Sequence, residues 1–212
     1  MTDPTSDILT QRAPRQERGR RRVDEILDAA EGLVAEVGPA AASIQEIARR
    51  AGASVGSIYH FFPTKDALFE GVRARFEEEV GGIAATMLAT ADEWARLDLA
   101  TFVDRSLAPF IELTERRPAI FLLSVNAAGQ RVPKDAAVDA AMREATLATF
   151  ARRYPDVPAA ELSLRVDVTR GLGDGLVALM LHADAGGRRR LLEELRRAIH
   201  GYLASYEEGA GR

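Results

Sequence analysis

The apolar residues of this chain recur at helical spacing almost throughout, and no segment shows the convincing alternation of a β-strand. In the segment that ends at Gly38, for example, they lie three or four positions apart along one face. These positions are Val23, Ile26, Leu27, Ala30, Leu33, Val34 and Val37. Because a stripe of this kind is buried by packing against other helices, the sequence predicts an all-α protein.

Capping and breaking residues divide the first third of the chain into short helices. The predicted caps are Ser43, paired with Glu46 in a capping box, Ser54 and Thr64, and the predicted stops are Gly38-Pro39, Gly52 and Pro63. After Phe76 the helices are longer, and the two at about 159–183 and 187–206 are the most apolar. The sequence therefore predicts a compact N-terminal unit of short helices and a larger helical C-terminal unit.

The composition excludes several classes of protein. The chain has 212 residues, of which 47% are hydrophobic, so it is long and apolar enough for one or two domains with cores. The absence of cysteine excludes disulfides, thiolate metal sites and cysteine nucleophiles. No apolar run reaches the ~18 residues of a membrane span, and the polar N-terminal segment lacks the apolar stretch of a signal peptide. We expect a cytoplasmic protein with no membrane partner.

Positive charge is concentrated near the N-terminus. The net charge is −4, so any nucleic-acid binding depends on a local patch. Residues 12–22 contain six arginines against one acid, whereas 17 basic and 21 acidic side chains follow Arg75. An arginine run alone is usually a solvated tail. Directly before short helices with a tight turn it favours phosphate binding, with Arg20 and Arg21 as candidates.

Two of the short helices, SIQEIARRA and SVGSIYHFF, are joined by a tight turn at Gly52 and Ala53. This is the sequence form of a DNA-binding helix-turn-helix, whose second helix enters the major groove. One face of that helix is apolar and would anchor it, and small residues near its N-terminus would let it approach DNA. The anchoring residues are Val55, Ile58 and Phe62, and the small residues are Ser54, Gly56 and Ser57. An ordinary helical hairpin would explain the apolar face but not the aromatics beside the small residues.

Residues 23–76 resemble the N-terminal domain of the TetR family of bacterial transcription regulators. The resemblance rests on the Gly38-Pro39 end of the first helix and on the motifs SIQEIARRAGAS, GSIYHFF and KDALF. With it, the chain divides into a disordered basic arm (1–17), a three-helix helix-turn-helix domain (18–64) and a helical effector-binding and dimerisation domain (65–212). The resemblance implies a regulator, by the family's usual mode a repressor, that binds double-stranded DNA at a palindromic operator.

Transferred position by position, the resemblance implies a set of DNA contacts. Residues expected at phosphates or the sugar–phosphate backbone are Ser43, Gln45, Tyr59, His60 and Lys65, and those expected nearest the bases are Ser54, Val55 and Ser57. Many relatives carry lysine where this chain has Val55, which offers apolar contact but no hydrogen bond. Base readout is therefore expected to depend on Ser57, DNA shape and the arginine arm. His60 fits a surface histidine equally well, and Phe61 is expected to pack under the first helix.

A single helix-turn-helix touches too few phosphates and bases for tight specific binding, so we expect a two-fold homodimer. The last two helices (about 159–206) are the predicted interface, and Gly171, Gly173 and Gly175 would permit close helix approach. These glycines do not form a nucleotide-binding loop, because no strand precedes them.

Three charged residues on the same segment, Asp167, Arg170 and Asp174, most simply form an ion-pair ladder within one helix. A network with the partner of a dimer and a role in ligand binding are the alternatives. The spacing alone does not separate these three interpretations.

The resemblance also implies a small-molecule pocket between the middle helices of the C-terminal unit. The candidate ligand-binding residues are Met87, Trp94, Phe102, Phe110, Phe121, Met142 and Met180, with Arg105, Asn126 and His182 as polar anchors. Each apolar candidate fits an ordinary helical core equally well. Their abundance favours a hydrophobic or amphipathic effector over a sugar or a nucleotide.

Two other kinds of function remain as alternatives. A helical enzyme is disfavoured, because the three histidines are scattered and no known catalytic or phosphate-binding motif is present. A DNA-binding dimer without an effector would share every N-terminal feature. We expect no cofactor and no metal ion.

Overall fold

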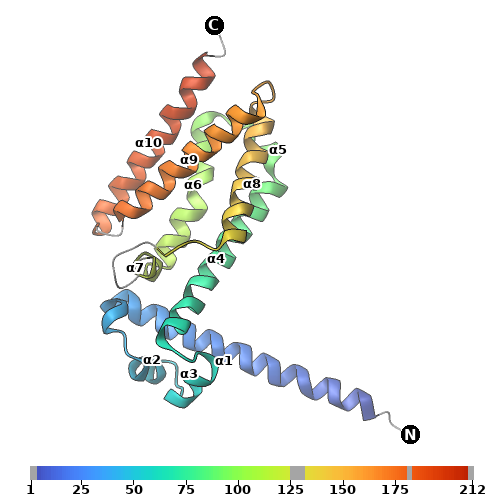
Figure 1. The fold of residues 1–212 in the computed structure, drawn as a ribbon, viewed down its shortest axis with the longest axis vertical. Coiled ribbons are helices and arrows are strands. Elements are labelled where there is room, and N and C mark those ends of the chain that lie inside the picture. Colours follow the sequence, from blue (N-terminus) through green and yellow to red (C-terminus); the bar gives the residue numbers. More distant parts are fainter. Residues whose placement is uncertain (1–3, 125–131, 181–182, 210–212) are drawn as a thin grey trace. The chain divides into compact units, whose positions relative to one another are not determined.

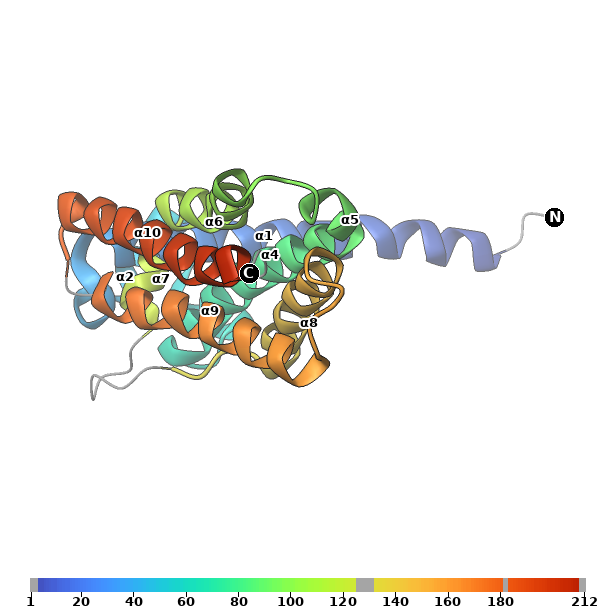
Figure 2. The same cartoon turned by 90° about the horizontal axis from the view of Figure 1, so that it is seen from above.

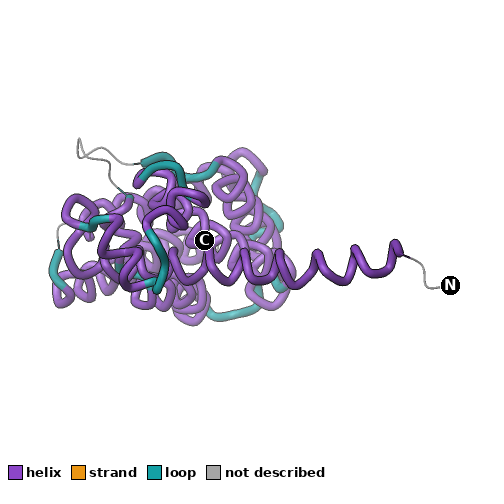
Figure 3. The backbone as a smooth tube through the Cα atoms, turned by 90° about the horizontal axis from the view of Figure 1, so that it is seen from below, coloured by secondary structure: helices purple, strands orange, loops and turns teal. Residues whose placement is uncertain are grey.

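Helices account for all regular secondary structure in the part of the chain that the structure describes (Figure 3). The structure is a computed structural model that describes residues 4–124, 132–180 and 183–209, and it confirms the predicted all-α class. Within those ranges, no helix is long and apolar enough to cross a membrane. In chain order (Figure 1) the helices are α1 (Pro4–Ala41), α2 (Ile44–Arg50), α3 (Val55–Phe61), α4 (Lys65–Ala89), α5 (Ala91–Trp94), α6 (Leu99–Arg116), α7 (Ala119–Leu123), α8 (Ala136–Arg153), α9 (Ala159–Met180) and α10 (Ala185–Gly209).

The chain divides into two compact units, Met1–Ala74 and Arg75–Arg212, and α4 runs from the first into the second. The domain division predicted from the sequence has this boundary earlier, after Thr64. The first turns of α4 belong to the N-terminal unit because they complete its core. Val72 is 3% exposed, and a Cβ on the neighbouring Gly71 would lie 3.0 Å from side-chain atoms of Leu27 and Phe62.

Helix α1 begins at Pro4, so residues 4–17 are helical where the composition predicts a disordered arm. Arginine, glutamine and glutamate are good helix formers, and a helix that is nucleated by packing propagates into such a segment. The predicted break at Gly38 is present, because this residue has φ 77° and ψ 162° inside the segment assigned to α1. Val37, just before the break, is 48% exposed and does not continue the buried stripe.

The buried apolar side chains of the N-terminal unit come from the first four helices and from Ala42, which lies between α1 and α2. Helix α3 contributes only Ile58, which is fully buried, while the other three helices contribute several each. The remaining members are Ile26, Leu27, Ala30, Leu33, Val34, Ala42, Ile44, Ile47, Ala48, Leu68, Phe69 and Val72. Since α3 is held by so few contacts, its position depends on the turn that precedes it.

In the C-terminal unit, α9 packs against α8 on one side and α10 on the other, and α10 also packs against α6 (Figure 2). The core between these helices is aromatic at its centre, where the Phe102 and Phe150 ring centroids lie 6.0 Å apart. The buried members of this core cluster are Ala84, Met87, Trp94, Phe102, Val103, Ala145, Phe150, Leu162, Val166, Leu195, Ile199 and Leu203. A smaller cluster is formed by Ile120, Phe121 and Met180.

Candidate DNA-binding and ligand sites

Ser43 caps the start of α2, and its side-chain oxygen accepts from the Glu46 amide at 3.2 Å. The predicted cap is therefore present, but the Glu46 carboxylate does not complete the predicted capping box. It accepts instead from Arg49 (2.7 and 2.8 Å) and Arg50 (3.0 Å). Hydrogen bonds from Arg49 and then Arg50 lower the pKa of Glu46 to about 2. Glu46 thus remains a carboxylate at neutral pH and offsets positive charge on the outer face of α2.

The turn after α2 is tight and depends on glycine. Gly52 has φ +58°, in the left-handed region that side chains other than glycine rarely adopt. The Ala53 amide donates to the Ala48 carbonyl at 2.9 Å, which closes the end of α2. Ser54 follows as the cap of α3, and its side-chain oxygen accepts from the Ser57 amide at 3.0 Å. The predicted helix-turn-helix geometry is present.

The seven residues of α3 separate into an inner and an outer side. Ile58 is fully buried, whereas Tyr59 is 48% exposed and His60 is also exposed. Val55 and Phe62, predicted as further anchors, are only half-buried. Phe61 is half-buried as well, and its ring meets that of His60 edge-on at 5.0 Å. The outer side therefore presents a phenol and an imidazole next to a helix N-terminus made of small residues.

Most of the predicted DNA contacts lie at the surface of the N-terminal unit. Ser43, Gln45 and Ser54 are exposed, and Ser57 is half-buried. A capping hydroxyl that accepts from a backbone amide still carries its own proton, which suits it to donate to a phosphate oxygen. Arg20 and Arg21 are exposed too. These exposed positions suit contact with DNA.

Lys65 differs from the predicted phosphate clamp in its contacts. Its ammonium group donates to the Ala40 carbonyl at 3.2 Å and lies 5.4 Å from the ring centroid of Phe69. The hydroxyl of Thr64 accepts from the Ala67 amide at 3.0 Å, so the predicted start of α4 is present. To bind a phosphate, Lys65 would have to exchange the Ala40 carbonyl for a phosphate oxygen.

The ten ligand candidates do not gather in one place. Met87, Trp94 and Phe102 belong to the main core cluster, against which Met142 packs, while Phe121 and Met180 belong to the smaller cluster. Phe110 is half-buried and Arg105 is exposed, with its guanidinium 5.1 Å from the Trp94 ring centroid. Asn126 and His182 lie outside the described residues. Most of the candidates are therefore core residues.

A cavity of about 490 Å³ lies between α4, α5 and α6 of the C-terminal unit. Two of the predicted residues, Met87 and Trp94, line it. The sequence analysis missed the other lining residues, which are Glu79, Gly82, Ile83, Thr86, Pro109, Glu112, Leu113 and Arg116. Two residues in the sequence could have indicated this cavity. Gly82 has no side chain to fill the space, and Pro109 lies inside α6.

The cavity is mainly apolar, with charge at its edge. The Glu79 carboxylate accepts from Arg116 at 2.8 Å and from Arg117 at 2.6 Å. Partial burial opposes ionisation, but the hydrogen bonds from Arg116 and Arg117 outweigh it and lower the pKa of Glu79. Trp94 is 5% exposed, and its indole N–H has no hydrogen-bond partner among the described residues. Such a site suits an apolar molecule with a small polar group.

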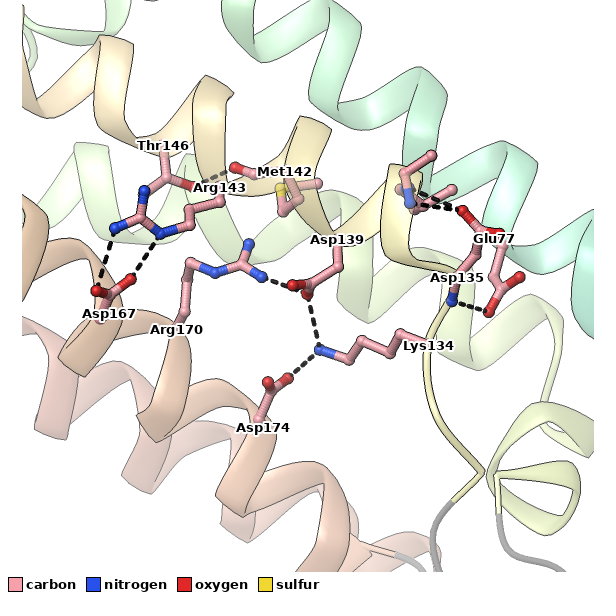
Figure 4. Close-up of polar contacts among 12 residues, drawn as sticks. Glu77, Lys134, Asp135, Asp139, Met142, Arg143, Thr146, Asp167, Arg170 and Asp174 are labelled. Atoms are coloured by element: carbon pink, nitrogen blue, oxygen red, sulfur yellow. Dashed lines mark hydrogen bonds and ion pairs between the residues drawn. The ribbon is translucent and has the colours of Figure 1, made fainter.

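The charged residues of α9 pair with α8 and the segment before it, as Figure 4 shows. Asp167 accepts from Arg143 at 2.8 and 3.1 Å, and Arg170 donates to Asp139. This arrangement corrects the interpretation of a ladder within one helix. The hydrogen bonds from Arg143 also lower the pKa of Asp167.

The same network continues toward α4 in the C-terminal unit (Figure 4). Lys134 pairs with Asp174 and lies 4.0 Å from Asp139. The Asp135 amide donates to the Glu77 carboxylate at 3.0 Å, and the Asp135 side chain caps α8. The network therefore ties the start of α8 to both α4 and α9 within one chain.

Two family models match the chain. The model described as "Bacterial regulatory proteins, tetR family" matches residues 26–72, which contain the helix-turn-helix. The model described as "Tetracyclin repressor-like, C-terminal domain" matches residues 98–203, which is half of the chain. None of the curated proteins compared by sequence matches.

Solved structures give the same fold at low sequence identity. A TetR-family transcriptional regulator from Streptomyces coelicolor is 23% identical, with a TM-score of 0.59, and the match covers 87% of this chain and 98% of that one. A TetR-family regulator from Mesorhizobium loti is 18% identical, with a TM-score of 0.58 and coverage of 89% and 98%. The multidrug binding protein EbrR, solved with malachite green, is 22% identical, with a TM-score of 0.55 and coverage of 85% and 97%. The chain belongs to the TetR family of bacterial transcription regulators, which are DNA-binding proteins and not enzymes.

Proposed function

We propose that the protein is a transcriptional repressor that binds a palindromic operator as a homodimer and is released by a small hydrophobic or amphipathic effector. The observation that carries the proposal is the two-sided helix α3. Ile58 anchors its inner side at 0% exposure, and Tyr59, at 48% exposure, stands on its outer side. A short helix held from behind, with small residues at its N-terminus, is suited to the major groove.

In this proposal, DNA contacts come from α1, from α2 and α3 with their caps, and from the start of α4. The hydroxyl of Ser43 donates to a phosphate, Tyr59 presses on the sugar–phosphate backbone, and Ser54, Val55 and Ser57 face the bases. The remaining proposed backbone and phosphate contacts are Arg20, Arg21, Gln45, His60 and Lys65. Because Val55 and Ser57 offer few hydrogen bonds, sequence choice depends in part on DNA shape.

The dimer is proposed to form through α9 and α10. Support comes from a stripe on α9, positions 164, 168, 171, 175 and 179, which falls within an arc of roughly 80° at 3.6 residues per turn. Leu164 and Leu179 at its ends are 61% and 59% exposed, although large apolar side chains favour burial. Gly171 and Gly175 in its middle have open space where a Cβ would lie, which suits close approach of a second helix.

The effector is proposed to occupy the cavity between α4, α5 and α6. Its volume of about 490 Å³ suits a small drug-sized molecule, and its walls are mainly apolar. EbrR, which shares the fold, binds malachite green. The effector must bind the DNA-free form of the dimer more tightly than the DNA-bound form, because only differential affinity shifts the equilibrium.

The function is tested by titrating the protein against duplexes from the region upstream of its own gene. One palindromic fragment is expected to shift in the presence of competitor DNA, with two chains bound per duplex. Deletion of the gene that encodes the protein is expected to raise expression of a reporter placed behind that fragment. Failure to shift any fragment contradicts the proposal. A shift that survives every compound bound by the cavity supports the alternative, a dimer without an effector.

The effector site is tested through Trp94, the single tryptophan of the chain. The neutral fluorophore N-phenyl-1-naphthylamine is expected to quench Trp94 emission by energy transfer when it enters the cavity. Gly82→Leu, which fills the cavity from α4, should weaken this binding by about tenfold, equivalent to roughly 1.4 kcal/mol. Open space surrounds the Cβ position at Gly82, so the substitution should not disturb the fold.

The matched control is Gly81→Leu. Gly81 also has open space at its Cβ position but does not line the cavity. Its variant should bind the fluorophore like the wild type. Equal effects of the two substitutions, or no energy transfer in the wild type, would count against this cavity as the effector site.

A further inference from the structure

Arg22 differs from the other arginines of the basic segment 12–22 whose side chains the structure describes. Its guanidinium lies on the turn between α2 and α3, where it donates to the Ala51 carbonyl at 3.1 Å and approaches the Gly52 carbonyl at 3.4 Å. The same nitrogen lies 3.0 Å from the Glu25 carboxylate. The Arg22 side chain is 39% exposed, compared with 78% for Arg21. One arginine therefore faces the protein while its neighbour faces solvent.

A cationic donor at this turn is favourable. The last carbonyls of a helix have no intrahelical partner and carry its negative dipole end, so a cation there is favourable. The Ala53 amide is used by the Ala48 carbonyl. Within the described part of the chain, no backbone amide donates to the carbonyls of Ala51 or Gly52. Arg22 supplies the missing donor from α1, about thirty residues earlier in the chain.

A second contact ties the same end of α2 to α1. Arg50, the last residue of α2, donates to both carboxylate oxygens of Glu36 at 2.7 Å. Arg22 and Glu36 lie at opposite ends of the packed part of α1, so this helix holds the turn from two points. Because α3 has one fully buried residue of its own, the direction of α3 depends on this turn.

We propose that Arg22 is a positioning residue for DNA binding: it fixes the turn that aims α3 and does not bind a phosphate. The inference rests on the DNA binding by α3 proposed above. A guanidinium that already has protein acceptors displaces no counterion when DNA arrives. Arg21, which is exposed and 3.8 Å from Glu25, is expected to displace one.

The test compares Arg22→Met with Arg21→Met on one duplex, which the wild type selects from a random-sequence pool. Arg22→Met should weaken binding by about tenfold at every salt concentration and leave the slope of log affinity against log salt unchanged. Arg21→Met should lower the magnitude of that slope by about one. Arg22→Lys keeps a donor within reach of the turn and should recover part of the lost affinity.

Hydrogen exchange without DNA gives a second and independent readout. The amides of Ala53 and Ser57 should exchange faster in Arg22→Met than in the wild type, and should be unchanged in Arg21→Met. Unchanged exchange in Arg22→Met overturns the inference, as does a salt slope that falls as it does for Arg21→Met. If the wild type selects no duplex, the proposed function fails, while the exchange measurement still decides the role of Arg22.

Discussion

Ile58→Ala is expected to abolish operator binding by detaching α3, while the helices of the C-terminal unit stay folded. Ile58 is fully buried and is the single fully buried residue of α3. Replacing a buried isoleucine by alanine costs about 2–5 kcal/mol. A unit of this size has a stability of only about 5 kcal/mol or slightly more. A helix of seven residues is not stable without its packing, so the loss falls on α3 first.

The expected result is a separation of the two units in thermal and chemical unfolding. The variant should lose protection from hydrogen exchange in α2 and α3, and retain it in the aromatic core around Phe150. Ile58→Val is the graded control, because it removes one methyl group and costs about 0.5–1.5 kcal/mol. It should keep most of the operator affinity. Full operator binding by Ile58→Ala would contradict the role assigned to this anchor.

Tyr59→Ala is the control for the opposite side of the same helix. Tyr59 adjoins Ile58 but is 48% exposed, so its removal should leave the unfolding curve of the N-terminal unit nearly unchanged. Binding to every operator sequence should nevertheless weaken by a similar factor, because a contact to the DNA backbone carries no sequence information. A change of sequence preference without loss of affinity would contradict the backbone contact.

Local signals in the sequence predicted the helix-turn-helix well. The caps at Ser43 and Ser54 and the stop at Gly52 depend on residues only three or four positions apart. Such short-range features can be predicted directly from the sequence. The exposed Tyr59 next to the buried Ile58 also follows from helical periodicity. Helical periodicity does not show which group a long side chain will bind. Arg22 was one of six similar arginines, and its acceptors lie about thirty residues away.

The same limit applies to the C-terminal unit. Asp167 and Arg170 were expected to pair along one helix, but their partners are on α8. Periodicity identified Phe102 as an inward residue without showing whether a core or a cavity surrounds it. A cavity forms where the side chains do not fill all of the space between the helices. Gly82 and Pro109 leave part of this space unfilled. The spacing of apolar residues in the sequence does not reveal such a space.

Leu164→Glu combined with Leu179→Glu is expected to convert a dimer into a folded monomer and to remove specific operator binding. Both leucines are more than half exposed in the single chain, so the substitutions cost its own stability little. In a two-fold interface each appears twice. Four leucines at about 1.5–3 kcal/mol each represent roughly 6–12 kcal/mol of lost burial. Four carboxylates brought together would add repulsion, so dissociation should be essentially complete at micromolar concentration.

The measurement is molar mass by sedimentation, together with operator titration. Leu88→Glu is the control, because Leu88 is 40% exposed on α4 and lies outside the proposed interface. It should remain dimeric and bind DNA normally. Gly175→Leu provides a steric version of the test. Open space surrounds its Cβ position in the single chain, so the monomer should tolerate leucine while the approach of a second helix is blocked. A dimer that survives both changes would require an interface away from α9. Loss of the dimer with full operator affinity would instead show that one recognition helix is sufficient, against the two-fold binding proposed here.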